Sequence, residues 1–212
     1  MPGGGGLRKC KCGEIYLLWE ALKMGFDAEP DTPRTQHLEA ADLPHAVNSS
    51  NKAVELAARR EYWMYLNHEY RDLYRAYREA EVKASQEKWA AKWQAANPDH
   101  RSAFKKVSDW FLRRKPAAPP PMVDKPFSVP PYQLTNLQLE NMTRLLELVL
   151  EGGNEPYGPD MLEVAEIYRE QGRFDAAAEA LRQCPEDDRG TPNQVMEQMI
   201  DKAVSAPVRY RM

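Results

Sequence analysis

The chain has 212 residues, of which 42% are hydrophobic and 29% are charged, and this balance excludes a natively disordered polypeptide and predicts one large or two small folded domains. No apolar run is long enough to cross a bilayer, and the first residues lack a signal-peptide pattern, so we expect neither membrane insertion nor secretion. Three cysteines are too few for the disulfide framework of a secreted domain, which indicates a reducing compartment and a cytoplasmic protein.

The net charge of −3 is unevenly distributed along the chain. Residues 52–115 carry 15 basic and 9 acidic side chains, whereas residues 134–212 carry 8 basic and 15 acidic ones. We interpret this asymmetry as two oppositely charged parts that dock on one another. A basic surface for nucleic acid or for an acidic partner is the alternative interpretation.

Residues 1–50 are expected to form an N-terminal region of short elements. Apolar side chains at helical spacing predict a helix over residues 14–24, which Gly25 ends. These side chains are Ile15, Leu18, Trp19 and Leu22. Three prolines between residues 27 and 50 predict an irregular connection, with a short helical turn near residues 37–41.

The longest helical signal begins at Asn48 or Ser49, either of which is a candidate N-cap, and continues without Pro or Gly up to Pro98. Its apolar stripe recurs at spacings of three, four or seven residues. The stripe consists of Tyr62, Leu66, Leu73, Tyr77, Ala80 and Ala84, broadened by Trp63, Tyr70 and Tyr74. We predict either one very long helix or two helices separated by a break around residues 67–68. A shorter basic helix is expected to follow, up to residue 114.

Seven of the 17 residues from 115 to 131 are proline, a density that forbids both a helix and a central strand. We therefore predict an extended, semi-stiff connector over residues 115–133 and place the main domain boundary there. The predicted parts are the N-terminal region (1–50), the long and the shorter helix (51–114), the connector (115–133) and a four-helix region (134–212).

Residues 134–212 are predicted to form four helices joined by short links. Their ends are marked by Thr135 or Asn136 and Gly152, by Asp160, by Gly172 and Pro185, and by Thr191 with Pro192 and Gln194. The side chains expected to face inward are Leu139, Met142, Leu145, Leu146, Val149, Met161, Val164, Ala165, Tyr168, Ala177, Ala178, Leu181, Met196, Met199, Ile200 and Ala203. Because no alternating strand pattern of useful length occurs, the predicted fold class is all-α, with a long aromatic-rich helix and a C-terminal antiparallel helical bundle.

Residues 165–181 resemble the middle of a tetratricopeptide repeat. The small, aromatic, turn-glycine, aromatic and small positions of that family are matched by Ala165, Tyr168, Gly172, Phe174 and Ala177. The resemblance covers about one repeat, residues 160–185, and Pro185 comes earlier than the proline of the family. It implies a packed helix pair with a surface for peptides or proteins, and no catalysis. An ordinary helical hairpin is the alternative.

The Cys-Lys-Cys-Gly sequence at residues 10–13 resembles one knuckle of a zinc ribbon, although one residue separates the cysteines where that family has two. A closed zinc site needs four ligands, and no second cysteine pair follows. The candidate ligands are Cys10, Cys12, Cys184 and His68, with His37 as an alternative to His68. Two reduced thiols without a metal are the other interpretation.

His68 and Glu69 begin like a helical zinc-protease motif, but Asp72 stands where the second histidine is required. Zinc held between His68 and Asp72 is geometrically feasible at this helical spacing. A cryptic metallohydrolase is therefore the least favoured function.

An aromatic stripe lies beside a basic one in the long helix. The residues are Tyr70, Tyr74 and Tyr77, and Arg71, Arg75 and Arg78. Rings that stack on bases beside guanidinium groups that bind phosphate are typical of single-stranded nucleic-acid binding. Because neighbouring acids dilute this charge, we favour tyrosines in a core or interface and arginines paired with acids three or four residues away.

Trp89 and Trp93 lie four residues apart and form either a patch for a partner helix or the inner face of a helix that folds back. No P-loop, dinucleotide fingerprint or nucleophile elbow occurs. The favoured function is a non-enzymatic protein-protein interaction or scaffolding module that binds a protein partner or forms a homo-oligomer. A zinc-binding, nucleic-acid-binding protein is the alternative.

Overall fold

The computed structural model describes residues 6–19, 36–98, 102, 104–105, 111–112, 120, 128–152, 160–184 and 191–208. The chain divides into two compact units, one of Met1–Arg71 with Pro131–Met212 and one of Asp72–Pro130. Within the described ranges no helix combines the length and the apolar character that crossing a membrane requires.

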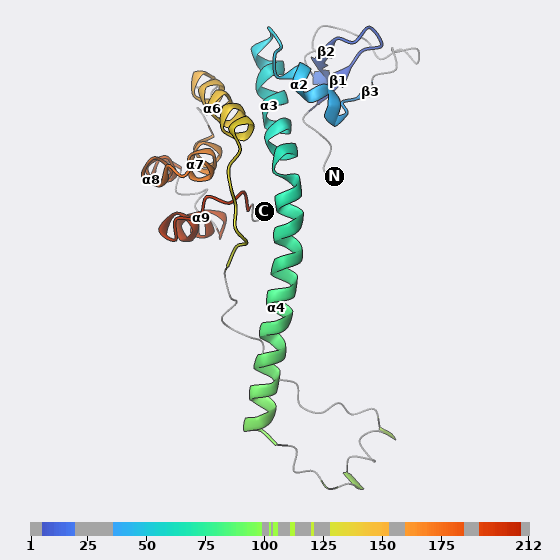
Figure 1. The fold of residues 1–212 in the computed structure, drawn as a ribbon, viewed down its shortest axis with the longest axis vertical. Helices are drawn as coiled ribbons and strands as arrows, with labels where there is room; N and C mark the ends of the chain where they lie inside the picture. The colour runs from blue at the N-terminus through green and yellow to red at the C-terminus, as the bar shows by residue number, and fades with distance from the viewer. Residues whose placement is uncertain are drawn as a thin grey trace. The chain divides into compact units, whose positions relative to one another are not determined.

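The described part of the chain is mainly helical, which confirms the all-α prediction (Figure 1). Its helices are η1 (Ala40–Asp42), α2 (Leu43–Ala46), α3 (Lys52–Leu66), α4 (His68–Ala96), α6 (Asn136–Glu151), α7 (Met161–Glu170), α8 (Phe174–Arg182) and α9 (Thr191–Asp201). The exception is a small antiparallel sheet near the N-terminus. Strand β1 (Leu7–Lys9) lies in its centre, between β2 (Ile15–Leu17) and β3 (Gln36–His37).

The sheet shows that the helix predicted over residues 14–24 is wrong for Ile15–Leu17, which form β2. Residues 18–19 are helical, and residues 20–24 lie outside the described ranges. Gly13, at φ +93°, adopts a backbone conformation that lets the chain reverse tightly between β1 and β2. A strand of three residues is too short to display the two-residue alternation that distinguishes a strand from a helix in a sequence.

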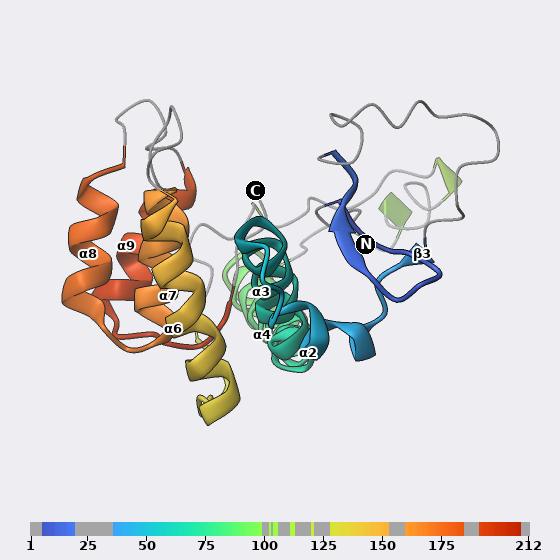
Figure 2. The same cartoon turned by 90° about the horizontal axis from the view of Figure 1, so that it is seen from above.

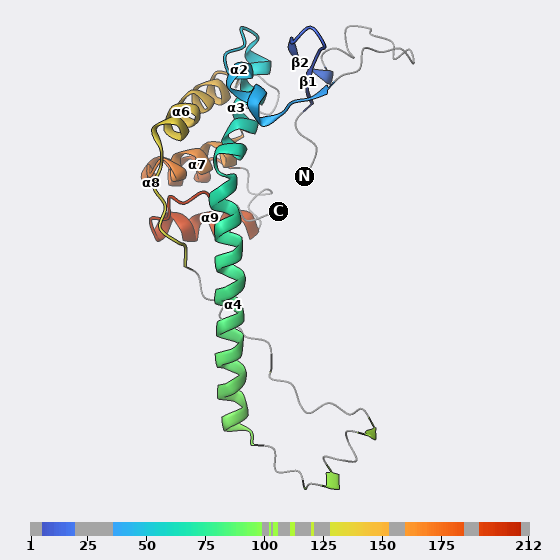
Figure 3. The same ribbon diagram turned by 45° about the vertical axis from the view of Figure 1, so that its right-hand side comes forward.

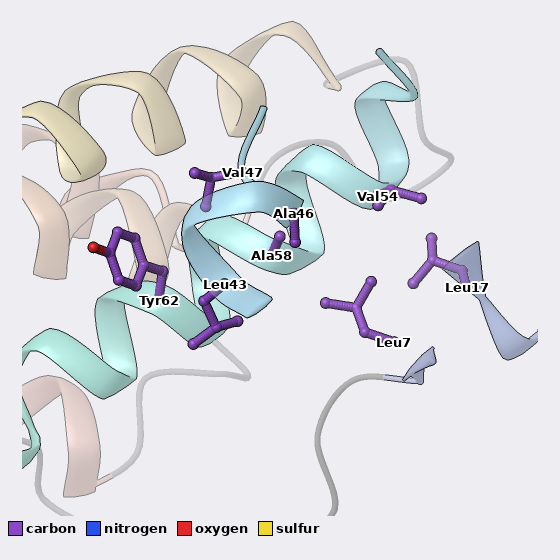
Figure 4. Close-up of a cluster of buried hydrophobic side chains, with 8 residues drawn as sticks. All are labelled: Leu7, Leu17, Leu43, Ala46, Val47, Val54, Ala58 and Tyr62. Carbon is purple, nitrogen blue, oxygen red and sulfur yellow. The ribbon is translucent and has the colours of Figure 1, made fainter. Parts of the chain in front are cut away.

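The sheet packs on α2 and α3 around one apolar cluster. Its buried members are Leu7, Leu17, Leu43, Ala46, Val47, Val54, Ala58 and Tyr62. Leu7 and Leu17 face each other across adjacent strands, and Figure 4 shows both side chains among residues of the two helices. Because full burial of a leucine contributes roughly 1.5–3 kcal/mol, this pair fixes the hairpin on α3.

The connection before α3 contains η1 and α2, so the helical turn expected near residues 37–41 begins at Ala40. The predicted N-caps of the long helix, Asn48 and Ser49, are both wrong. The amide of Asn48 closes α2, and the Ser49 hydroxyl accepts the amide of Asn51 at 3.2 Å. The side-chain oxygen of Asn51 caps α3 by accepting its first amides at 2.9 and 3.4 Å.

Helices α3 and α4 are separated at Asn67, which confirms the second of the two predicted alternatives. The amide of Asn67 donates to the carbonyl of Trp63 at 3.3 Å, and its own carbonyl accepts the amide of Arg71 at 3.0 Å. Backbone hydrogen bonding therefore continues across the break. Helix α4 ends at Ala96, two residues before Pro98, as predicted.

The C-terminal helices begin and end where local sequence signals predict. Thr135 and Gln138 form a capping box on α6, and the Asp160 carboxylate accepts the first amides of α7 at 3.1 Å. Gly172, at φ +76°, makes the turn between α7 and α8. These signals are local, and the short contacts that satisfy them form within a few residues of each helix end.

Two of the inward-facing predictions for these helices are wrong. Leu139 is exposed, because α6 turns Gln138 and Asn141 inward instead, where Gln138 bonds to the end of α3 and to Asn67 and Asn141 bonds to Arg59 of α3. Ala203 is exposed, because α9 ends at Asp201. The predicted residues that are fully buried are Met142, Leu145, Leu146, Val149, Val164, Ala165, Ala177, Leu181, Met196 and Met199.

Helices α6 and α7 pack on α3, so the N-terminal elements and the C-terminal helices form one unit. Arg144 of α6 binds Glu55 at 3.0 Å, and Arg60 binds Glu163 of α7 at 2.6 Å. Figure 2 shows α6 to α8 on one side of α3 and the sheet on the other, and Figure 3 shows α6, α7 and α9 in successive layers. Residues 131–212 therefore do not form a bundle separate from the N-terminal elements. The proline content of the connector suggested a boundary there, but it carries no information on contacts between distant segments.

The second unit consists of α4 from Asp72 onward and the chain that follows it. The Tyr77 hydroxyl lies 2.9 Å from the Ser128 hydroxyl, and the Trp89 indole donates to the carbonyl of Pro120 at 2.9 Å. Described parts of the proline-rich segment therefore bond back to α4. Most of that segment, and most of the shorter basic helix predicted up to residue 114, lies outside the described residues.

Candidate functional site

A carboxylate with no exposed surface lies where α7 meets the break between α3 and α4. Oε2 of Glu170 accepts hydrogen bonds from the indole of Trp63 at 2.6 Å and from the side-chain amide of Asn67 at 3.0 Å. Oε1 faces the guanidinium groups of Arg169 and Arg71 at 3.7 and 3.8 Å, beyond hydrogen-bond range. One side chain of α7 thus contacts both sides of the helix break.

Arg169 is fully buried and is shared between an acid and the C-terminal segment. Its guanidinium donates to Glu166 at 2.9 and 3.3 Å. It also donates to the carbonyls of Val204 at 2.6 Å and Ala206 at 2.9 Å. These bonds use four of the five guanidinium donors of Arg169, fasten residues 204–206 to α7, and leave Nη2 3.7 Å from Oε1 of Glu170.

Gln138 of α6 completes the polar contacts of the break. Its side-chain amide donates to the side-chain oxygen of Asn67 at 2.8 Å and to the carbonyl of Leu66 at 3.1 Å. The second bond satisfies a carbonyl that the end of α3 leaves without a helical partner. We call the side chains of Trp63, Asn67, Arg71, Gln138, Glu166, Arg169 and Glu170 the Glu170 network.

The electrostatics of the network favour a neutral Glu170 below neutral pH. Burial raises the pKa of Glu170 to about 7, and the negative charge of Glu166 raises it further. The guanidinium groups of Arg169 and Arg71 and the hydrogen bond from Trp63 act in the opposite direction without restoring the usual value. The carboxyl therefore titrates near neutral pH.

Tyr132 lies beside this carboxyl. Its hydroxyl is buried and, like Oε1 of Glu170, has no hydrogen-bond partner among the residues that the structure describes. Burial raises the pKa of Tyr132, and the charge of Glu170 adds to the rise, so the phenol stays protonated. The network is closed to solvent, so it suits fastening of helices rather than chemistry on a substrate.

The aromatic residues predicted to bind a partner occupy different environments. The Tyr70 ring is half-buried and meets Tyr132 edge-on, with centroids 4.9 Å apart. Tyr77 is 39% exposed, whereas Tyr74 is half-buried. The two tryptophans of the prediction, Trp89 and Trp93, are also half-buried.

The arginine stripe is engaged with neighbouring groups. Arg75 pairs with Asp72 at 3.1 Å and Arg78 with Glu81 at 2.7 Å, which confirms the predicted pairing with acids three residues away. Arg71 instead points into the first unit, where its Nε donates to the carbonyl of a C-terminal proline at 3.1 Å. These three arginines therefore do not form a row of cations that could bind phosphate groups.

A hollow of about 170 Å³ opens between α2, α3 and α6. It is lined by Pro44, Val47, Asn48, Arg59, Tyr62, Leu137, Glu140 and Asn141. Leu137 is 48% exposed, and Tyr62 stacks on Tyr65, which is 50% exposed. We call Tyr62, Tyr65, Leu137 and the hollow the apolar ledge. The sequence did not predict the apolar ledge, because Leu137 is not among the residues expected on the inner face of its helix and Tyr65 is not part of the predicted aromatic stripe.

The predicted metal ligands are only partly brought together. Cys10 and Cys12 meet in the β1–β2 turn, where the amide of Cys12 lies 3.5 Å from Sγ of Cys10, and hydrogen bonds from the thiol and amide of Cys12 lower the pKa of Cys10. Cys184 is buried after α8 and contacts the carbonyl of Ala180, while His68 is exposed on α4. All three cysteines are free thiols.

No group of three or more His, Cys, Asp or Glu side chains in the described ranges is arranged to hold a metal ion. The fold places β3, with His37, next to the strand that precedes Cys10, but the His37 side chain lies outside the described residues. The structure therefore brings Cys10 and Cys12 together without Cys184 or His68.

No protein-family model matches the chain, and comparisons with curated proteins and with solved structures found no match. The tetratricopeptide resemblance concerns the α7–α8 hairpin. Ala165 and Ala177 are fully buried, and Gly172 makes the reversal. The family itself stays a prediction.

Proposed function

We propose that this protein is a non-enzymatic interaction or scaffolding module that binds a protein partner through the apolar ledge. The observation that carries the proposal is the hollow between α2, α3 and α6. Leu137, which is 48% exposed, lines it, and Tyr65, which is 50% exposed, stacks on the lining residue Tyr62. Large apolar side chains beside a preformed depression are typical of surfaces that receive an anchor residue.

The size and lining of the hollow favour a protein side chain as its occupant. Pockets for cofactors and drug-sized ligands are about 300–1,000 Å³, larger than the 170 Å³ found here. Val47 and Tyr62 give the lining a buried apolar part, and Glu140 is an exposed acid beside them. A partner segment with one apolar anchor and a flanking basic residue matches this lining in shape and charge.

Two further proposals follow from the same fold. The first is a tetratricopeptide-like hairpin over residues 160–185, whose helix α7 is joined to α3 by the Arg60–Glu163 ion pair and the Trp63–Glu170 hydrogen bond. We also place the module in the cytoplasm, because its three cysteines are free and none is positioned in a disulfide framework.

The test compares two leucine substitutions on one helix. Leu137→Asp puts a charge at the ledge, and Leu150→Asp puts the same charge at a site of similar exposure, 45%, at the other end of α6. Wild-type and both variants are purified from cell extract under mild conditions, and the retained proteins and the oligomeric state are determined by native mass spectrometry.

We expect one partner, or a second copy of the chain, to be retained by the wild type and by Leu150→Asp and lost by Leu137→Asp. Retention by all three proteins would exclude the ledge. A strict monomer that retains nothing would exclude an interaction module of any kind.

A further inference from the structure

Glu170 is positioned to hold the break between α3 and α4 closed. The indole of Trp63 in the last turn of α3 and the side-chain amide of Asn67 in the break both donate to Oε2. The guanidinium of Arg71, in the first turn of α4, approaches Oε1 at 3.8 Å. Separation of α7 from the break would break these contacts together.

The two carboxyl oxygens are not equivalent, and their difference suits a protonated acid. Oε2 accepts both hydrogen bonds, whereas Oε1 is buried and accepts none from the described residues. A proton on Oε1 therefore displaces no donor. The protonated carboxyl keeps both hydrogen bonds and carries no charge that burial would penalise.

Neither of the two guanidinium groups near Glu170 donates a hydrogen bond to it, although Nη2 of Arg169 and Nη2 of Arg71 lie 3.7 and 3.8 Å from Oε1. The charged groups that face it are Glu166 and Arg169 from α7 and Arg71 from α4. Arg169 is engaged with Glu166 at 2.9 Å, and Arg71 donates its Nε to the C-terminal segment. From the segment before α6 comes the protonated phenol of Tyr132, while α3 contributes only neutral donors. An ionised Glu170 would thus be a buried charge whose two nearest cations lie beyond hydrogen-bond range, at 3.7 and 3.8 Å.

We propose that Glu170 is a proton-controlled latch: the protonated carboxyl holds the α3–α4 break closed against α7, and loss of the proton favours opening of the break. The latch is a property of the fold and does not depend on the apolar ledge.

The direction follows from linkage between protonation and opening. When the α3–α4 break is closed, burial raises the pKa of Glu170 to about 7. When the break is open and water reaches the carboxyl, its pKa returns to the usual 4.5. The closed form binds the proton more tightly, so it is favoured most below pH 4.5 and loses that advantage as the pH rises to 7. The difference between these two pKa values corresponds to roughly a 300-fold decrease, from low to high pH, in the ratio of closed to open forms of the α3–α4 break.

The first measurement is a proton titration read at Trp63. The protein contains five tryptophans, and the indole signal of Trp63 is assigned in ¹⁵N-labelled protein by its loss in Trp63→Phe. We expect this signal to titrate with a midpoint near pH 7. A midpoint near 4.5, or no titration between pH 4 and 9, would overturn the proposal, and this readout needs no variant at Glu170.

The second measurement is hydrogen exchange at the amide of Arg71, which bonds across the break to the carbonyl of Asn67 at 3.0 Å. Corrected for intrinsic exchange, its protection should fall by about 70-fold between pH 5 and 8. Glu170→Gln keeps an acceptor oxygen and removes the proton, so its protection should be independent of pH. Glu147→Gln, at an exposed acid of α6, should behave like the wild type. A pH-independent wild type, or an unchanged fall in Glu170→Gln, would contradict the latch.

Discussion

Replacing Asn67 by alanine separates two effects that act at the α3–α4 break. Alanine has the higher helix propensity, by about 0.5–0.7 kcal/mol, so local preference alone predicts a continuous and more stable helix. The buried asparagine, however, donates to Glu170 at 3.0 Å and accepts from Gln138 at 2.8 Å. The substitution therefore decides whether the break is maintained by local or by long-range interactions.

The structure predicts a net loss of stability for Asn67→Ala. Each buried hydrogen bond contributes about 1 kcal/mol, and the carboxyl left with one donor fewer costs about 1–3 kcal/mol more. Subtracting the gain in helix propensity leaves a decrease of about 2–4.5 kcal/mol in the free energy of unfolding. Glu170 retains the Trp63 donor and Gln138 retains the carbonyl of Leu66, which limits the loss.

Urea unfolding monitored by far-ultraviolet circular dichroism measures this difference, provided that the slope of the transition is the same for both proteins. Thr143→Ala is a matched control on α6, since Thr143 is an exposed residue whose hydroxyl bonds only within its own helix and to Gln171. A variant as stable as the wild type, or more stable, would refute the reasoning that the Glu170 network sets the break.

Three further outcomes are expected. Leu17→Ala should lower the free energy of unfolding by about 2–5 kcal/mol in thermal melts, because Leu17 is 2% exposed, whereas an unchanged melt would mean that the sheet is not fixed on α3. Arg144 holds the pKa of Glu55 below its usual value, so part of the stability present above pH 4.5 should be lost as the pH falls below it, and Glu55→Gln should remove that part in urea unfolding at pH 3–6. If zinc copurifies with the protein, elemental analysis should show its loss in Cys10→Ser and Cys12→Ser, because these thiols share one turn, and zinc that persists in both variants would exclude the hairpin as its site.

Helix ends were the most predictable part of the fold. Thr135, Asp160 and Gly172 each act within one turn of the chain, so their effect is visible in the sequence. The break at Asn67 was one of two predicted alternatives, because the polar pair after Leu66 interrupts the apolar stripe without stopping it.

The contacts that join the unit were not predictable in the same way. Trp63 and Glu170 are 107 residues apart, and no periodicity within either helix indicates that they bond. Periodicity also assigned polar residues of α7 to its outer face, whereas Glu166, Arg169 and Glu170 are buried. A helix covered on several sides shows no clear polar face, so the pattern cannot reveal which acid lies inside. The β1–β2 hairpin was also not predicted, because strands of three residues are too short to show the alternation of apolar and polar residues that identifies a strand.

The polar composition of the junction argues for specificity rather than for added stability. Apolar side chains of similar volume at Asn67, Arg169 and Glu170 would bury comparable surface without the cost of desolvating charges. Such side chains, however, would pack equally well with α3 and α4 joined as one helix or shifted by a turn. The hydrogen bonds of Glu170 and Gln138 instead hold the side chain of Asn67 at the one position where α3 passes into α4. The network therefore selects one position of α7 and α6 against the break, and the buried acid that makes this selection also makes it sensitive to protons.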